Sequence, residues 1–457
     1  MRILLLIAIV SLTACMPAPQ AEVTMRRPAE TGATPSIQGM QAFVGTGILA
    51  SQRSNAEIAT DILNLEFRME SGRPLSQLSR FSGTITLALA GNVPATAAAD
   101  LSRLIARFRS EAGIDLRMAE PGQTASVNII FEPRAALQRL VPTAACFVVP
   151  GVSSLAEYNA RRGTAEVDWT RITTRQRVSV FVPADTSPQE VRDCLHEELA
   201  QAMGPLNDLY SLPDSVFNDD NFHTILTGFD MLVLRVHYSP DLQAGMNEAE
   251  MARRLPAILA AYNPAGQFQG NAPERLSPRS WNDAVAQALG AGSSPGARMA
   301  GGEKMLAIAK AQGWQDNRLG FAYFVIGRMQ LSRQPEAAVA NFAEALRVYN
   351  SLPDGGVHAA HVHMQLAAIA LASGDNIQAM SYADRAIPVV RRAENAALLA
   401  TLEMIKSHAL ANLGRNAEAQ ALRLDSQSWA RYGFGGDGQI RAHQGEIAAL
   451  AARGQRG

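Results

Sequence analysis

The 457-residue sequence lacks an excess of either charge, a long apolar run and cysteines spaced for zinc. Its 41 basic and 42 acidic residues leave a formal net charge of −1 with both signs interspersed, so composition gives no electrostatic case for nucleic acid or an anionic membrane surface. No stretch approaches the roughly 20 apolar residues of a membrane-spanning helix. The three cysteines include neither a Cys-x-x-Cys pair nor Cys/His zinc spacing. We therefore expect no nucleic-acid partner and no cysteine-bound zinc.

The N-terminus, MRILLLIAIVSLTACMPAPQ, has its own pattern. The apolar run at residues 3–10 is too short to span a bilayer and has the length of a signal-peptide core. It leads into LTAC (12–15), which resembles the lipobox of bacterial lipoproteins. The resemblance implies a lipoprotein signal peptide at 1–15 and membrane anchoring in the cell envelope through lipid on Cys15. Met16, where an Asp would favour the inner membrane, implies the outer membrane, facing the periplasm. An ordinary secretory signal with a chance cysteine is the alternative.

Residues 16–40 are rich in Pro, Ala, Thr and Gly without periodicity, which is typical of a flexible tether. The rest of the chain has room for two or three domains. With Cys15 assigned to lipid, Cys146 and Cys194 remain, and an oxidising periplasm favours a disulfide between them. Such a bridge would stabilise the fold by about 3–5 kcal/mol because it closes a long loop. Two free, buried thiols are the alternative.

The first half of the chain alternates between strand and helix signals. Strands are predicted at 83–91, 125–133 and 175–183. Residues 95–113 place apolar side chains on one helical face and end in glycine, and a capping sequence from Ser187 starts a further helix at 188–203. This order predicts a sheet with helices packed on it.

The last of these helices contains the stretch CLHEELAQAMGPLND (194–208). Starting from His196, the zinc-peptidase pattern HExxH requires a second His at the position of Ala200, so one ligand is missing. One residue later, five positions have the spacing of a longer pattern, HExxHxxGxxH: Glu197, Glu198, Gln201, Gly204 and Asn207. This resembles the metzincin signature with all three ligand His positions replaced and its Glu and Gly kept.

Downstream segments extend the resemblance. The stretch SVFN (215–218) is similar to the Met-turn of the matrixin branch, with Phe217 in place of the Met, and LTGFD (226–230) followed by Tyr238 is similar to the matrixin C-terminal helix. The resemblance covers roughly 80–245 and implies an α+β metzincin-like (zincin) fold. Together with the lipobox, the arrangement resembles the proteobacterial lipoproteins grouped as domain of unknown function 2927, a family name that supplies no activity.

The replaced ligands oppose zinc chemistry. Zinc prefers imidazole nitrogen or thiolate sulfur, whereas Glu197, Gln201 and Asn207 offer one carboxylate and two weak amide oxygens. A poorly held metal cannot lower the pKa of its water, which leaves Glu198 with nothing to deprotonate. We therefore expect a degenerate site that holds no metal or cofactor.

Three other interpretations of these residues stay open. One is an oxygen-rich Ca²⁺ site that draws ligands from Asp208, Asp219, Asp220 and His223. Another is an unusual hydrolase with Glu198 as its general base. The plain alternative gives each residue a structural role: His196 hydrogen-bonds in the core, Glu198 pairs with Gln201 on the helix surface, and Asn207-Asp208 forms a helix-exit turn.

The C-terminal half contains self-similar segments. Residues 322–349, 362–390 and 402–429 each show a helix, a polar turn and a second helix, with Gly374 and Gly414 40 residues apart in the turns. Alanines at matching places in the second helices resemble the small-residue pattern of tetratricopeptide repeats, although the period exceeds that family's 34 residues. The resemblance implies a groove for a peptide or protein partner. A plain helical bundle is the alternative.

We thus predict a metzincin-like α+β domain at 41–245, a helical linker at 246–302 and an all-α tetratricopeptide-like domain at 303–457. The favoured function is a protein-binding or scaffolding module of the cell envelope with a pseudo-metallopeptidase domain. The alternative is an atypical metal-dependent hydrolase, a peptidase or cell-wall hydrolase, that uses Glu198 as its general base.

Overall fold

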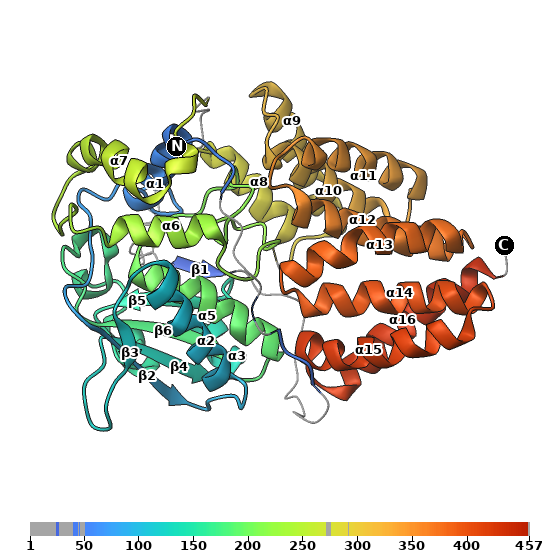
Figure 1. Ribbon diagram of the computed structural model, residues 1–457, viewed down its shortest axis with the longest axis horizontal. Coiled ribbons are helices and arrows are strands. Elements are labelled where there is room, and N and C mark those ends of the chain that lie inside the picture. Colours follow the sequence, from blue (N-terminus) through green and yellow to red (C-terminus); the bar gives the residue numbers. More distant parts are fainter. Residues whose placement is uncertain are drawn as a thin grey trace, which may run out of the picture.

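The computed structural model describes residues 24–26, 40–43, 45, 51–270, 276–290 and 292–455. Figure 1 shows a sheet with packed helices beside an array of helices. The expected signal peptide, including Cys15, lies outside the described residues. Within the part of the chain that is described, no helix is both long enough and apolar enough to cross a membrane.

A six-stranded mixed sheet, in the order β1-β5-β6-β4-β2-β3, forms the centre of the first part. Strands β2, β3, β4 and β6 run parallel, β5 is antiparallel to β6, and β1 is antiparallel to β5. The strand bounds are β1 Thr24–Arg26, β2 Ile85–Gly91, β3 Leu116–Met118, β4 Val127–Glu132, β5 Cys146–Pro150 and β6 Val178–Pro183.

The three strands expected from the sequence correspond to β2, β4 and β6. Strand β1 lies inside the segment expected to be a flexible tether, and backbone pairing with β5 holds its three residues in the sheet. Strand β5 was missed because its sequence, CFVVP, has no polar position and so lacks the alternation that Ser179 gives to β6.

Seven helices accompany the sheet among the described residues. They are α1 Asn55–Glu66, α2 Ala97–Glu111, α3 Arg134–Leu140, α4 Leu155–Arg161, α5 Pro188–Met203, α6 Gly228–His237 and α7 Glu248–Tyr262. Helix α5, which carries the motif, packs on β5 and β6 with α2 beside it. A disulfide joins Cys194 of α5 to Cys146 of β5, with 6.0 Å between their Cα atoms. The structure therefore contains the bridge rather than two free thiols.

The second part is a helical array that begins with the hairpin α8 (Arg279–Leu289) and α9 (Pro295–Ala311). Three antiparallel pairs follow, and a single helix ends the chain. The pairs are α10 Asn317–Gln330 with α11 Pro335–Asn350, α12 Gly356–Ala372 with α13 Asn376–Arg392, and α14 Ala396–Asn412 with α15 Asn416–Phe434; the last helix is α16 Asp437–Gly454. The three self-similar segments fall on these pairs, so the array has a repeat-like architecture.

The segment expected as a helical linker, 246–302, contains α7, α8 and the start of α9, which pack into the two parts. Helix α7 lies in the core of the first part, where the Asn55 side-chain amide donates hydrogen bonds to the carbonyls of Leu259 and Asn263 at 3.2 and 3.0 Å. The Gly/Ser/Pro stretch 290–302 enters helix α9. Its Gly301 lies so close to α8 that an added Cβ would come within 2.7 Å of the Ala288 nitrogen.

Candidate functional site

Helix α5 is buried on every side, which is unusual for a helix with so many polar residues. Sheet strands cover one side, α2 lies beside it, and α15 of the array packs against it. The helix begins at Pro188, where the Ser187 hydroxyl accepts a hydrogen bond from the Glu190 amide, while the Glu190 carboxylate pairs with Arg134 at 3.0 Å. Because polar groups removed from water are costly unless they are paired, each polar side chain of α5 needs a partner inside the protein.

The carboxyl end of α5 is fixed by Arg175, a residue that the sequence analysis did not single out. Its guanidinium donates to the carbonyls of Gln201, Ala202 and Gly204 at 2.5–2.8 Å, and it lies over the Trp169 ring. These carbonyls have no partner within the helix, and a cation at a helix C-terminus is electrostatically favourable. Burial lowers the pKa of Arg175 to about 10. Gly204 leaves little room for a larger residue, since an added Cβ would lie 3.1 Å from Leu234.

The His196 side chain forms a hydrogen bond inside the core. Its Nδ1 accepts a hydrogen bond from the backbone N–H of Leu226 at 3.1 Å, so that nitrogen carries no proton, and a neutral ring is protonated on Nε2. Leu226 immediately precedes the N-cap of α6, Thr227. His196 thus links α5 to the start of α6, in agreement with the structural role proposed for it. Ala200, at the position of the missing second His, is also buried.

Glu197, Glu198 and Gln201 are all buried, and the last two are fully enclosed. The Gln201 side-chain amide lies 3.4 Å from Asp208 and donates to its carboxylate. The idea that Glu198 and Gln201 pair on the helix surface is therefore wrong about their location, because neither side chain reaches solvent.

The two downstream motif positions serve the loop that follows α5. The Asn207 amide donates to the carbonyl of Asn64 in α1 at 2.9 Å, which ties the loop to another helix. Phe217 is fully buried, and its backbone N–H donates to the Ser215 hydroxyl at 2.9 Å. That hydroxyl in turn donates to Asp230 of α6 at 2.5 Å. The Met-turn-like segment is therefore a packed turn held by α6.

The residues considered as calcium ligands point to different partners. Asp219 accepts from the Tyr210 hydroxyl at 2.7 Å, Asp220 contacts His358 at 2.9 Å, and His223 Nε2 donates to the Pro213 carbonyl at 3.0 Å. Among the described residues, no group of three or more His, Cys, Asp or Glu side chains is placed to hold a metal ion. The donor set at the motif does not fit the zinc ion that the fold resemblance would imply.

The first half of α5 forms an interface with the array. Arg192 donates to the carbonyl of Glu394 at 2.8 Å and pairs with Asp193. The Gln189 amide donates to Asn395 at 3.1 Å and accepts from the backbone N–H of Ala397 at 2.8 Å. These three array residues occupy the turn into α14. The start of α14 and the turn before it therefore cover the first half of α5.

The loop after α5 enters the array in a second place. Phe222 lies in the hydrophobic core of the array, with ring contacts of 4.6–5.9 Å to Phe321, Phe324, His358 and His361. The buried contact between Asp220 and His358 lies beside it. The loop and α5 together join the two parts through buried aromatic and charged contacts.

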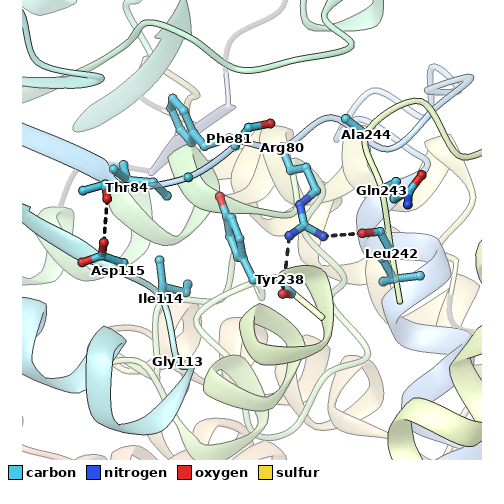
Figure 2. Close-up of a pocket in the computed structure, with 13 residues that line it drawn as sticks. Arg80, Phe81, Thr84, Gly113, Ile114, Asp115, Tyr238, Leu242, Gln243 and Ala244 are labelled. Atoms are coloured by element: carbon cyan, nitrogen blue, oxygen red, sulfur yellow. Dashed lines mark hydrogen bonds between the residues drawn. The ribbon is translucent and has the colours of Figure 1, made fainter. Parts of the chain in front are cut away.

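A cavity of about 600 Å³ lies away from the motif helix, at the amino ends of β2 and β3 (Figure 2). Arg80 lines it, yet its guanidinium already donates to the carbonyls of His237 and Leu242 at 2.9 and 2.8 Å and so caps the end of α6. Tyr238 donates to the Met203 carbonyl at 2.8 Å, and Thr84 donates to Asp115 at 2.6 Å. The polar groups of this cavity thus fix the ends of helices and strands.

Comparison with known proteins supports a family for the first part. Residues 55–257 match the family described as "Protein of unknown function (DUF2927)". The matched range starts at the first residue of α1 and ends within α7, so it covers the α/β part except for β1 and the end of α7. No curated protein and no solved structure matches the chain.

The histidines around Phe222 predict a pH-dependent stability. Burial and the neighbouring His358 lower the pKa of His361 from 6.5 to about 3, and burial also lowers that of His223. Below pH 6.5 the unfolded chain therefore binds protons that the folded protein excludes, and stability falls as pH decreases. Between pH 7 and 5, the free energy of unfolding of wild type should fall by about 1–2 kcal/mol more than that of His361→Gln, measured by urea unfolding.

The change in stability with pH must be compared between wild type and His361→Gln, because two carboxyl groups also titrate abnormally. Burial raises the pKa of Asp230 to about 6 and that of Glu403 to about 8. These carboxyl groups oppose the histidines, since their contribution to stability is lost as pH rises. Ser102→Ala, on the exposed face of α2, removes no titrating group, so it is the control and should follow wild type. Parallel curves for wild type and His361→Gln would contradict the assignment.

Proposed function

We propose that this protein is a lipid-anchored binding and scaffolding protein of the cell envelope, composed of a metallopeptidase-like domain without the chemistry and a tetratricopeptide-like array. The observation that carries the proposal is the enclosure of helix α5. Its motif residues are buried, and its first half is covered by array residues Glu394, Asn395 and Ala397. A peptidase needs its metal ligands and general base to be accessible to the substrate. In a scaffold, the corresponding helix can instead connect two packed parts of the protein.

A hydrolase that uses Glu198 as general base is disfavoured by the same contacts. A general base must lie within hydrogen-bond distance of the proton that it removes, directly or through one water. The Glu198 side chain is fully enclosed, and the nearby donors Gln201 and Asn207 are amides. Solvent-excluded surroundings that offer amides in place of imidazole ligands do not support a metal-activated water.

The binding surface proposed for the array is its exposed apolar side chains at the repeat turns. Ile377 at the start of α13 is 72% exposed, and Leu413 at the end of α14 is 41% exposed. A hydrogen bond of 3.0 Å from Asn412 to Asn376 joins the residues next to them, so the two side chains belong to one region of the surface. Their transfer out of water would favour association with a protein partner.

In the full-length protein, a photo-crosslinking side chain at position 377 should capture a discrete envelope protein in the native bacterium. The crosslink should persist in Glu198→Gln, because the carboxylate has no part in binding, and should weaken in Leu413→Asp, because the apolar surface is lost. The same crosslinker at Val93, which is 40% exposed in the α/β part, is the matched control.

Metal binding together with catalysis would contradict the scaffold proposal. One such result would be stoichiometric metal and peptide hydrolysis in wild-type protein purified without chelator. If Glu198→Gln lost both, the hydrolase would be supported and the scaffold proposal would be wrong. Elemental analysis of wild type and Glu198→Gln makes this measurement.

The proposed anchor makes a separate prediction. If lipid on Cys15 holds the protein in the membrane, Cys15→Ser should appear in the soluble envelope fraction without detergent, while wild type should require detergent for release. Fractionation followed by immunoblotting, with metabolic incorporation of labelled fatty acid, measures both. Wild type that carries no fatty acid and needs no detergent would contradict the anchor.

A further inference from the structure

The segment before α1 is attached to the protein at two places. Strand β1 is the first, because its backbone pairs antiparallel with β5, with Thr24 opposite Val148 and Arg26 opposite Cys146. Strand β1 also packs against the motif helix α5. Since β5 pairs with β6 on its other side, β1 occupies the edge of the sheet. The segment expected to be a flexible tether, 16–40, thus contains residues that are fixed in the fold.

The second attachment lies on the helical array. The Gln41 backbone N–H donates to the Ser428 carbonyl of α15 at 3.1 Å, and the Phe43 ring stacks on the Trp429 ring with 4.5 Å between their centres. Met40 and Phe43 are both partly buried against the array core. The segment is therefore held by the α/β part at β1 and by the array at residues 40–43.

These attachments limit how far the protein can lie from a lipid on Cys15. Residues 16–23 alone separate Cys15 from β1. Each residue of an extended chain adds at most about 3.3–3.6 Å, so the chain from Cys15 to Thr24 spans at most about 30 Å. A tether that ran freely to Asn55, where α1 begins, would span up to about 130–140 Å. Pairing of β1 with β5 therefore shortens the available reach about fourfold.

The register of β1 identifies the end of the sheet that this chain reaches. Strand β1 runs from Thr24, opposite Val148, to Arg26, opposite Cys146, so its amino end points toward Pro150, the last residue of β5. Pro150 lies opposite the first residue of β6. The amino end of β1 is therefore on the side of the sheet where the parallel strands begin.

Two basic residues at this end of the sheet are already paired with carboxylates. Arg177, just before β6, donates to Glu157 at 3.3 Å, and Arg117 of β3 donates to Asp115 at 3.2 Å. The whole chain has a formal net charge of only −1, which gives no general attraction to an anionic lipid surface. The orientation toward a membrane therefore follows from the length of the chain and should withstand high salt.

We propose that the end of the sheet at Thr24 and Pro150 is the surface of this protein that faces the membrane, held within about 30 Å of the anchor by the chain between Cys15 and β1. The partner of this surface is the bilayer that holds the lipid. The inference rests on the lipid anchor proposed above and adds the orientation of the protein. The start of α4, five residues beyond Pro150, then lies on the membrane side of the molecule.

Energy transfer to the bilayer tests this orientation with the full-length lipidated protein in vesicles of phosphatidylethanolamine and phosphatidylglycerol. A fluorescent residue at the exposed position Ala156 of α4 is the donor, and a headgroup-labelled lipid is the acceptor. A flexible insert of about 40 Gly and Ser residues after Gln20 should lower the transfer efficiency at least about twofold. The reason is that the mean span of the chain before β1 lengthens from about 15–18 Å to about 35–42 Å.

The same insert after Gly32 is the matched control. It lengthens the segment by an equal amount but lies between β1 and the contacts of Gln41, so the transfer should equal that of wild type as long as β1 holds the chain. Both inserts lie in the expected tether, and the circular dichroism of the two proteins should match that of wild type.

Equal losses of transfer for the two inserts would show that β1 does not hold the chain and would overturn the proposal. No loss for either insert, or loss of the wild-type transfer in high salt, would assign the proximity to adsorption and would overturn it as well. Wild type without fatty acid in the fractionation experiment would instead remove the anchor itself, so the two failures are distinguishable.

Discussion

The burial of polar helix α5 is the constraint on which the rest of the structure depends. Arg192, Asp193 and Glu198 cannot leave water without partners, because an unpaired buried charge costs several kcal/mol. Arg192 finds its partners in Asp193 of the same helix and in Glu394 of the array, and the loop after α5 inserts Phe222 into the array core. The two parts consequently complete each other's interiors. Removing either one would expose charged and aromatic side chains that are now satisfied.

This constraint also accounts for what remains of the peptidase-like motif. Gly204 is retained because the helix ends tightly against α6, and Arg175 binds the carbonyls released there. His196 is retained because the start of α6 needs its ring nitrogen. Gly204 and His196 therefore each have a structural reason for their place, independent of any metal. The match of residues 55–257 to a family of unknown function covers this part of the chain and supplies no activity.

Local sequence patterns predicted much of the fold but little of the site. The strands at β2, β4 and β6, the motif helix and the three helix pairs were predictable because each has a regular period or a clear start and stop signal. Strand β5 was not, since its sequence CFVVP has no polar position, and the first half of α9 was hidden by glycines that serve close packing at Gly301. The contacts of Arg192 and Phe222 join residues far apart in sequence. No local pattern of residues encodes such pairs.

Differential scanning calorimetry of the full-length protein tests the central claim, that α5 makes the two parts one structure, most directly. The account predicts a single transition in which the calorimetric and van't Hoff enthalpies agree, because neither part is complete alone. It also predicts that Arg192→Met lowers that one transition without dividing it. Two separate transitions in wild type, with the array melting while the α/β part stays folded, would contradict the account.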